Sequence, residues 1–211
     1  ASPKVNYSPA KSARKASKGA DSGLPSLKFI EPQFCKLVDR PPQGAGWAHE
    51  IKFDGYRVQI WVKGGKTTIF TRRGLDWTDK FGEIAAACAK LPDCVMDGEI
   101  CALDQNGHPD FAGLQAAIAD QKTTDLIFFV FDLLFDGDED TRPLPLLDRK
   151  ARLKARVNGA DTRIRYVDHF LTAGDAVLQS ACRMDLEGIV SKKADAPYRS
   201  GRGDIWTKAK C

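Results

Sequence analysis

Apolar and polar residues follow the pattern of half-buried β-strands in three consecutive stretches in the first third of the chain. These stretches are Trp47 to Phe53, Tyr56 to Lys63 and Lys66 to Arg72. Gly64 and Gly65 separate the last two, and a Gly-Gly pair between two strands favours a tight hairpin turn. The pattern therefore predicts a hairpin preceded by a further strand.

The rest of the chain alternates between helical and strand patterns. Thr78 to Leu91 carries its apolar residues on one helical stripe, and Asp110 is suited to cap a short helix that runs to Ile118. Two further helices are predicted, at Leu147 to Val157 and Thr172 to Met184. Four further strands are predicted, at Cys94 to Leu103, Asp125 to Phe135, Glu187 to Lys193 and Ile205 to Lys210. Hairpins mixed with helices predict an α+β fold with antiparallel sheets and helices outside.

Composition limits what this fold can be. Hydrophobic residues make up 43% of the 211 residues, enough for a buried core, and the net charge of +4 is only a weak indication of nucleic-acid binding. No apolar run reaches membrane-spanning length, so no membrane partner is expected. Residues 1–25 are rich in Ser, Ala, Lys and Pro and predict a flexible basic linker or tail, which leaves residues 26–211 as the globular domain.

The cysteines are scattered along the chain. They are Cys35, Cys88, Cys94, Cys101, Cys182 and Cys211. None form a C-x-x-C pair or have metal-ligand spacing with the histidines, so a zinc site is not predicted. In a charged chain without a signal peptide, this pattern predicts buried thiols in a reducing cytosol.

A lysine, a carboxylate and an arginine gather at the predicted turn between the first two strands. The segment is Lys52-Phe53-Asp54-Gly55-Tyr56-Arg57. A lysine attacks an α-phosphate only as a neutral amine, so it needs a lowered pKa, which neighbouring cations and a metal would supply. The alternative is a surface turn with a solvated charge cluster.

Two later strands each place a pair of notable residues on one face. Asp97 and Glu99 share a face, where two carboxylates repel unless a metal, a sugar hydroxyl or a basic group meets them. A salt-bridged surface strand is the alternative. Phe129 and Phe131 also share a face, and such a pair is more often core than a platform for a base.

The last strand carries Lys208 and Lys210 on one face. Two neighbouring ammonium groups favour an anion between them, and a phosphate fits. The alternative is a solvated sheet edge. Their position after Trp206 in the final segment favours the phosphate.

Taken in order, these segments resemble the motifs of the covalent nucleotidyltransferases, which comprise DNA ligases, RNA ligases and mRNA capping enzymes. Lys52 to Arg57 resembles K-x-D-G-x-R. The other elements are Thr71-Arg72-Arg73-Gly74, Asp97-Gly98-Glu99-Ile100, Phe129-Val130-Phe131-Asp132, Glu187-Gly188-Ile189-Val190-Ser191-Lys192 and Trp206-Thr207-Lys208-Ala209-Lys210. The stretch from Glu50 to Arg57, with Leu37-Val38-Asp39 upstream, is similar to the ligase domain of bacterial ligase D, an enzyme of non-homologous end joining.

The resemblance implies a role for each motif residue. Lys52 is the implied nucleophile, which takes AMP from ATP onto itself. The implied ATP-binding residues are Glu50, Ile51, Arg57, Arg72, Glu99, Phe131, Val190, Lys208 and Lys210. Asp54 and Glu187 are the implied ligands of a divalent metal, Mg or Mn, because Mg²⁺ usually takes one or two carboxylates and the substrate phosphates. By the same resemblance, Phe131 is the adenine platform, whereas Phe129 is expected to be core.

The resemblance also implies a fold and a reaction. The fold is the DNA ligase adenylation fold, ATP-grasp-like, with two antiparallel sheets flanked by helices and the nucleotide between them. AMP would pass from Lys52 to a DNA 5′-phosphate, from which a 3′-hydroxyl displaces it. Implied partners are nicked or broken duplex DNA, further domains of the same polypeptide (an OB-fold, polymerase and nuclease modules) and an end-binding protein. We expect a monomer in the bacterial cytoplasm, associated with the nucleoid.

The sequence departs from a complete ligase at its end. The chain stops at Cys211, directly after the last motif, whereas ligases of this family continue into an OB-fold domain. We therefore expect a catalytic core without that domain, which binds ATP but seals nicks slowly. Two alternatives to a DNA ligase are a capping or RNA-joining enzyme with the same lysine and a non-catalytic DNA-end binding module, which the intact lysines and carboxylates disfavour.

Overall fold

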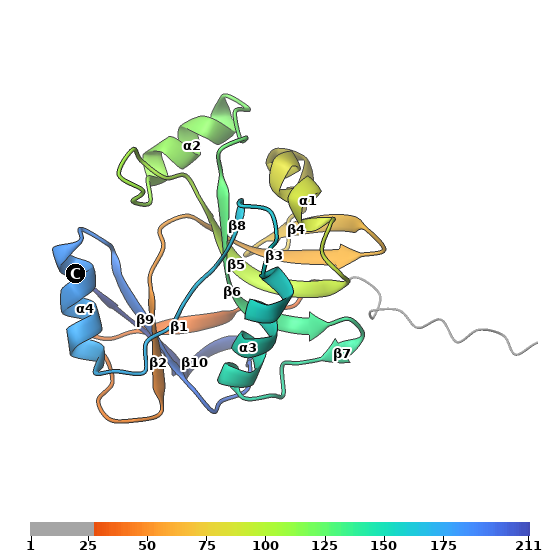
Figure 1. The fold of residues 1–211 in the computed structure, drawn as a ribbon. Helices are drawn as coiled ribbons and strands as arrows, with labels where there is room; N and C mark the ends of the chain where they lie inside the picture. The colour runs from red at the N-terminus through yellow and green to blue at the C-terminus, as the bar shows by residue number, and fades with distance from the viewer. Residues whose placement is uncertain (1–27) are drawn as a thin grey trace, which may run out of the picture.

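A computed structural model describes residues 28–211, in which two β-sheets pack against each other with helices around them (Figure 1). The predicted linker or tail at residues 1–25 lies outside the described residues. The smaller sheet, here called sheet A, has the strand order β1-β10-β9-β2. Its strands are β1 (Gln33–Leu37), β2 (Trp47–Ile51), β9 (Gly188–Lys193) and β10 (Gly201–Lys210).

The larger sheet, sheet B, has the order β4-β3-β5-β6-β7, and β8 pairs with β6. Its strands are β3 (Tyr56–Lys63), β4 (Lys66–Thr71), β5 (Cys94–Cys101), β6 (Ile127–Asp136), β7 (Glu139–Asp140) and β8 (Ile164–Tyr166). Gly64 and Gly65 form the predicted hairpin turn between β3 and β4, with φ values of 55° and 73° that glycine adopts without strain.

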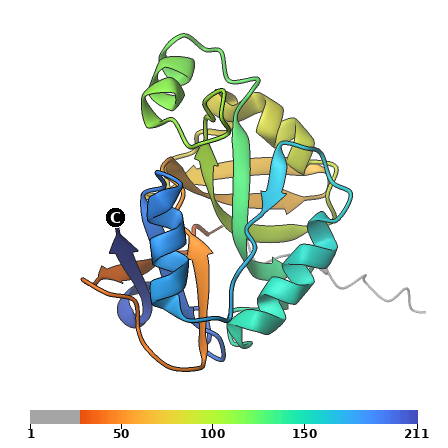
Figure 2. The same ribbon diagram turned by 60° about the vertical axis from the view of Figure 1, so that its left-hand side comes forward.

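Helices cover the outer faces of both sheets (Figure 2). Against sheet B lie the 3₁₀ helix η1 (Thr78–Phe81), α1 (Gly82–Cys88) and α3 (Leu146–Val157), while α4 (Gly174–Arg183) packs on sheet A. The α2 helix (Phe111–Ala119) begins as predicted, because the Asp110 carboxylate accepts a hydrogen bond from the Gly113 amide at 2.9 Å. The segment from Thr78 to Leu91, which was predicted as one helix, instead forms η1 followed by α1.

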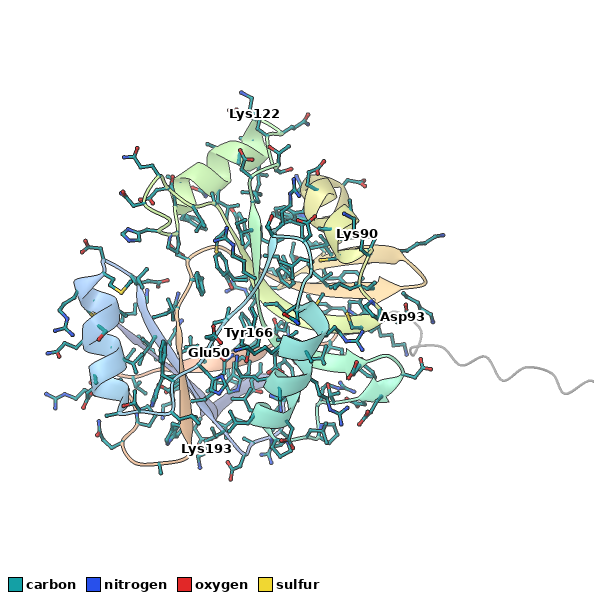
Figure 3. All side chains as sticks on the ribbon, viewed as in Figure 1. Glu50, Lys90, Asp93, Lys122, Tyr166 and Lys193 are labelled. Atoms are coloured by element: carbon teal, nitrogen blue, oxygen red, sulfur yellow. A yellow bond between two sulfur atoms is a disulfide. The ribbon has the colours of Figure 1, made fainter. Side chains whose placement is uncertain are left out.

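Alternation along the strands divides the core into layers. In β3, Ile60 points to the helices of sheet B, whereas its neighbour Trp61 points to the space between the sheets. There Trp61 joins Phe135 of sheet B and Trp206 of sheet A in one buried cluster. Charged side chains of surface residues such as Lys90, Lys122 and Lys193 surround this interior (Figure 3).

The α+β prediction of two sheets flanked by helices is confirmed. The sheets are mainly antiparallel, but β1 runs parallel to β10 and β8 runs parallel to β6. The strands β1, β7 and β8 were not predicted, because they are short or lack a clear alternation of apolar residues. β10 begins at Gly201, four residues before the predicted start at Ile205, because pairing with β1 extends it.

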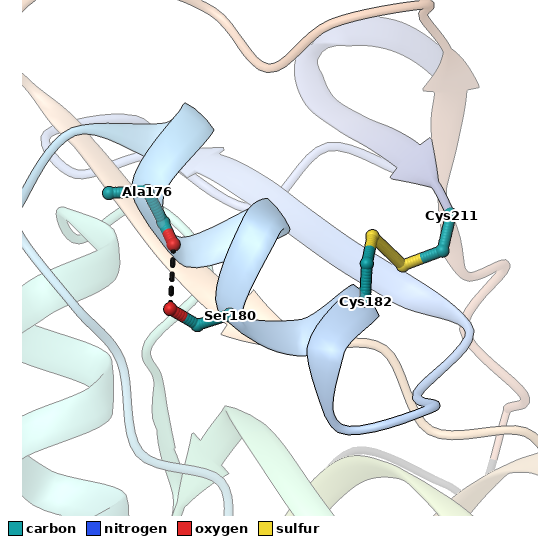
Figure 4. Close-up of a disulfide and its surroundings, with 4 residues drawn as sticks. All are labelled: Ala176, Ser180, Cys182 and Cys211. Carbon is teal, nitrogen blue, oxygen red and sulfur yellow. Dashed lines mark hydrogen bonds between the residues drawn. A yellow bond between two sulfur atoms is a disulfide. The ribbon is translucent and has the colours of Figure 1, made fainter.

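The prediction that every cysteine is a thiol is wrong for two of them. Cys182, near the end of α4, forms a disulfide with Cys211, and their Cα atoms lie 5.4 Å apart (Figure 4). The two residues are 29 positions apart in sequence, and they meet because α4 leads into β9, which pairs with the last strand, β10. Cys35, Cys88, Cys94 and Cys101 are free, and the last three are buried.

Candidate active site

A cavity of about 470 Å³ lies between the two sheets, a size that suits a nucleotide. Its lining includes most residues that the sequence motifs singled out. These are Glu50, Ile51, Lys52, Arg57, Arg72, Glu99, Phe131, Val190 and Lys208. Three predicted residues, Asp54, Glu187 and Lys210, are outside this lining.

Strand pairing explains why residues so far apart in sequence converge at one edge of sheet A. β9 is antiparallel to both β2 and β10, so its start lies beside the ends of these two strands. Lys52 follows β2, Glu187 precedes β9 and Lys210 ends β10. The three side chains therefore meet, although 158 positions separate the first from the last in the sequence (210 minus 52).

Lys52 and Glu187 form an ion pair at this edge, in which Lys52 Nζ donates to Glu187 Oε2. The other carboxylate oxygen of Glu187 lies 2.9 Å from Lys210 Nζ. Burial works to raise the pKa of Glu187, but the hydrogen bonds from the two lysines outweigh it and lower that pKa. Glu187 is therefore a carboxylate at neutral pH and holds the Lys52 side chain in place.

Sheet B contributes a second group of residues at the starts and ends of its strands. Arg57 at the start of β3 pairs in register with Glu99 near the end of β5. The Arg57 guanidinium also binds Asp97 with two hydrogen bonds, of 3.0 and 2.7 Å. Asp97 accepts a further hydrogen bond from the Tyr198 hydroxyl at 2.7 Å. The two carboxylates predicted on one face of β5 thus have different surroundings. Asp97 binds Arg57 and Tyr198, whereas Glu99 lines the cavity.

Glu99 is a carboxylate in an unfavourable environment. Burial raises its pKa to about 7, while the nearby charges of Arg57 and Lys52 oppose that shift. A carboxylate that lacks its full hydration gains from a hydrogen-bond donor supplied by a ligand, such as a sugar hydroxyl. Glu99 is therefore an acceptor in the cavity wall that a donor from a ligand would stabilise.

Aromatic residues also line the cavity. Phe131 is half-buried, and the Arg57 guanidinium lies 5.3 Å from its ring centroid. Trp206 meets Phe131 edge-on, with centroids 6.2 Å apart. Phe129 is buried, as predicted, and stacks on Phe53 at 3.9 Å. Phe131 is therefore the ring of this pair that a flat ligand can reach.

Glu50 is the second acidic residue in the cavity wall. Its carboxylate forms ion pairs with Lys150 at 2.5 Å and with Lys192 at 2.6 Å, and all three side chains are buried. Ile51 lies on the other face of β2, where its side chain packs against the apolar cluster under α4. Ile51 nevertheless belongs to the lining of the cavity.

Asp54 and Glu187, the two residues predicted to bind metal, both offer carboxylate oxygens. Asp54 is exposed in the same turn as Lys52, and both oxygens of Glu187 contact lysines. Within residues 28–211, no group of three or more His, Cys, Asp or Glu side chains is placed to hold a metal ion. These two carboxylates fit Mg²⁺ or Mn²⁺ only together with oxygen atoms from a bound phosphate.

Several cavity residues were not predicted as site residues. They are Phe34, Cys35, Phe53, Arg73, Lys192, Arg202 and Trp206. Four of them, Phe53, Arg73, Lys192 and Trp206, fall inside the quoted motifs, so the sequence did carry a signal for them. Phe34 and Cys35 reach the cavity only because β1 pairs with β10, which no motif indicates.

The chain matches the family model of the ATP-dependent DNA ligase domain over residues 29–210. It belongs to that family. This confirms the family expected from the motifs. Among residues 28–211, no helix is long and apolar enough to cross a membrane.

Known ligases are similar to this domain in sequence. "Multifunctional non-homologous end joining protein LigD" of Pseudomonas aeruginosa is 36% identical over 203 residues, which cover 94% of this chain and 24% of the relative. "DNA ligase C2" of Mycolicibacterium smegmatis is 32% identical, over 83% of this chain and 52% of the relative. The chain thus spans about a quarter to a half of the length of these relatives.

Solved structures show the same fold. "Mycobacterial DNA ligase D complexed with ATP and MES" has a TM-score of 0.76 and 26% identity, over 87% of this chain and 62% of that one. The ligase domain of M. tuberculosis LigD has a TM-score of 0.72 and 25% identity, over 86% of this chain and 60% of that one. The DNA ligase domain described here therefore shares the fold of the matched part of these two structures.

Proposed function

We propose that this domain carries out the nucleotide-transfer chemistry of an ATP-dependent DNA ligase, with Lys52 as the residue that becomes attached to AMP. One observation carries the proposal: in a chain that belongs to the ligase family, Lys52 lines a nucleotide-sized cavity together with aromatic and cationic side chains. The relatives named above are DNA ligases, and one similar structure is described as a complex with ATP.

In the proposed first step, the Lys52 amine attacks the α-phosphorus of ATP. An N–P bond forms at Lys52 Nζ, the bond to the bridging oxygen breaks, and pyrophosphate leaves. The attacking nitrogen must lose a proton, and Glu187 Oε2 already accepts a hydrogen bond from it. The protein contributes mainly by positioning the amine in line with the leaving group and by neutralising charge.

The remaining cavity residues have proposed roles in holding the nucleotide. Adenine stacks on Phe131 with Val190 on its other side, and Glu99 accepts a hydrogen bond from the ribose. Arg57, Arg72, Lys208 and Lys210 neutralise phosphate oxygens. Asp54 and Glu187 would hold a divalent metal, which supplies further charge neutralisation at the phosphates.

Transfer of AMP to a DNA 5′-phosphate, and sealing by a 3′-hydroxyl, belong to the same proposal. Nicked or broken duplex DNA is the proposed substrate, since the relatives include end-joining proteins. The relatives are also longer than this chain, so further domains, among them an OB-fold, and an end-binding protein are proposed partners. A bacterial cytoplasmic location near the nucleoid is proposed on the same basis.

The decisive experiment follows label from ATP to the protein. Lys52→Arg keeps a positive charge but replaces the nucleophilic amine with a guanidinium, which stays protonated. Wild-type protein incubated with ATP labelled at the α-phosphorus is expected to gain one AMP by mass, and Lys52→Arg none. Lys28→Arg is a matched control at an exposed lysine and keeps the label.

Other outcomes separate the alternatives. Label from GTP in place of ATP would indicate chemistry of the capping type. An unlabelled wild-type protein that still binds DNA ends would indicate a non-catalytic module. Label retained by Lys52→Arg would move the nucleophile to another residue.

A further inference from the structure

Lys150 is a buried lysine that belongs to none of the sequence motifs. It lies on α3, and its side chain is fully buried. Burying an ammonium group is unfavourable unless it is paired and hydrogen-bonded. Lys150 therefore has to be explained by what its Nζ contacts.

Lys150 links α3 to Glu50, which lines the cavity. Its Nζ donates to Glu50 Oε1 at 2.5 Å and to the Val167 carbonyl at 2.9 Å, and it lies 4.7 Å from the centroid of the Tyr166 ring. The Phe131 carbonyl oxygen is 3.5 Å away. Glu50 and Tyr166 are labelled in the interior of the molecule in Figure 3. A single ammonium group thus contacts both the acidic residue of the cavity wall and the strand that carries the aromatic platform.

Lys192 approaches Glu50 from the other side. Its Nζ is 2.6 Å from Glu50 Oε2 and lies 4.3 Å from the Phe131 ring centroid and 4.1 Å from the Trp206 ring centroid. Burial lowers the pKa of Lys192, and Glu50 opposes that shift. The two lysines hold the Glu50 carboxylate between them, and Lys192 lies beside the Phe131 and Trp206 rings.

This arrangement leaves Glu50 able to accept but not to donate a hydrogen bond. An ionised carboxylate has about four lone-pair sites, and the two lysines occupy one on each oxygen. The remaining lone-pair sites of Glu50 can accept a hydrogen bond from a ligand, because Glu50 lines the cavity. An acceptor of this kind favours a purine with an amino group at C6 and disfavours a purine with a carbonyl oxygen there.

We propose that Lys150 is a positioning residue for base selection, which acts by holding the Glu50 carboxylate in place beside Phe131. The inference rests on the proposed function, since it takes the base to lie against Phe131. It goes further by assigning the choice between 6-amino and 6-oxo purines to a helix residue outside the motifs. The side chain of Lys150 itself does not touch the nucleotide.

The test compares ATP with inosine triphosphate, which has a carbonyl oxygen in place of the C6 amino group and carries a hydrogen on N1. Lys150→Met removes the ammonium but keeps a long unbranched side chain. Lys150→Arg restores a cation, and Lys154→Met on the same helix is the matched control, since Lys154 is 65% exposed. For each variant, kcat and KM of AMP or IMP attachment to the protein are measured, together with the melting temperature.

The expected result is a loss of selectivity rather than a loss of activity alone. Lys150→Met should lower the preference for ATP over inosine triphosphate by roughly tenfold, mainly through a higher KM for ATP. Lys150→Arg should recover most of that preference, and Lys154→Met should leave it unchanged. Equal falls with both nucleotides would show that Lys150 only supports the fold and would overturn the inference.

A second variant keeps the test decisive if Lys150→Met does not fold. Glu50→Gln preserves the shape of the residue through which Lys150 is proposed to act, and its amide can donate to a C6 carbonyl oxygen. An unchanged preference in folded Glu50→Gln protein overturns the inference. Wild-type protein that attaches no nucleotide at all would instead contradict the proposed function, so the two failures are distinguishable.

Discussion

Glu99 shows at the scale of a single residue how the site is prepared for a ligand. Its carboxylate lies in the cavity wall near Lys52 and Arg57, yet burial raises its pKa to about 7. The fold keeps this residue although its charged form is poorly solvated. Such a cost to stability is expected at a binding site, and the proposed hydrogen bond from the ribose would offset it.

The raised pKa of Glu99 predicts that ionisation of this residue lowers the free energy of unfolding as the pH rises. Between its ordinary pKa of 4.5 and about 7, the folded protein binds a proton that the unfolded chain releases. Folding stability from this group is therefore fully present below pH 4.5 and is lost as the pH rises towards 7. Glu99→Gln removes the ionisation, so it should be more stable than wild type at pH 8, by on the order of 2 kcal/mol, and gain little at pH 4.5.

Urea unfolding of both proteins at several pH values measures this difference. The same variant should also use ATP less well if Glu99 accepts a hydrogen bond from the ribose. Parallel stability curves for Glu99→Gln and wild type across this pH range would show that Glu99 titrates normally.

At the scale of elements, the site depends on how closely the start of β9 approaches the end of β10. Gly188 has a φ of 145°, and a Cβ there would lie 2.1 Å from the Ala209 carbonyl oxygen. Its own carbonyl accepts a hydrogen bond from the Lys52 amide at 3.0 Å. The glycine of the E-G-x-x-x-K motif is thus required by strand packing, and it places Glu187 beside Lys52 and Lys210.

Gly188→Ala should therefore damage both stability and the site. We expect a loss of at least about 3 kcal/mol in the free energy of unfolding, because the methyl group forces β10 away and the backbone is strained. Gly82→Ala is the control, since no atom lies within 4 Å of an added Cβ and the site is at the start of α1. That change should be neutral or stabilising by up to about 1 kcal/mol. Equal urea midpoints for the two variants would contradict the packing explanation.

At the scale of the whole molecule, the disulfide ties the end of the chain to α4. Cys182 and Cys211 are 29 positions apart, and the loop that they close includes all of β9 and β10. The amide of Cys211 also donates to the Glu187 carbonyl at 3.1 Å. The cross-link therefore restrains the strands that carry Glu187 and Lys210.

Reduction of this disulfide should lower stability by about 3 kcal/mol, because the unfolded chain regains the entropy of an open loop. Urea unfolding with and without reductant measures the effect. The double variant Cys182→Ser with Cys211→Ser should respond to reductant no more than background, since the other described cysteines are free. A wild-type midpoint that does not move on reduction would show that the cross-link adds nothing to stability.

The sequence alone determined the local features of this protein. Alternation predicted β2, β3 and β4, and capping by Asp110 predicted α2, because both patterns depend on neighbouring residues. The motif residues around Lys52 were also readable, since their spacing is fixed by turns and strand ends. The family that these motifs indicated was confirmed.

Only the tertiary structure decided how distant residues meet. Strand order and register bring Glu187 and Lys210 to Lys52, pair Cys182 with Cys211, and add Phe34 and Cys35 to the cavity. Lys150 contacts Glu50 across 100 positions of sequence, which no local pattern encodes. Local periodicity reports which face of an element is buried, whereas the partner on that face depends on the packing of the whole chain.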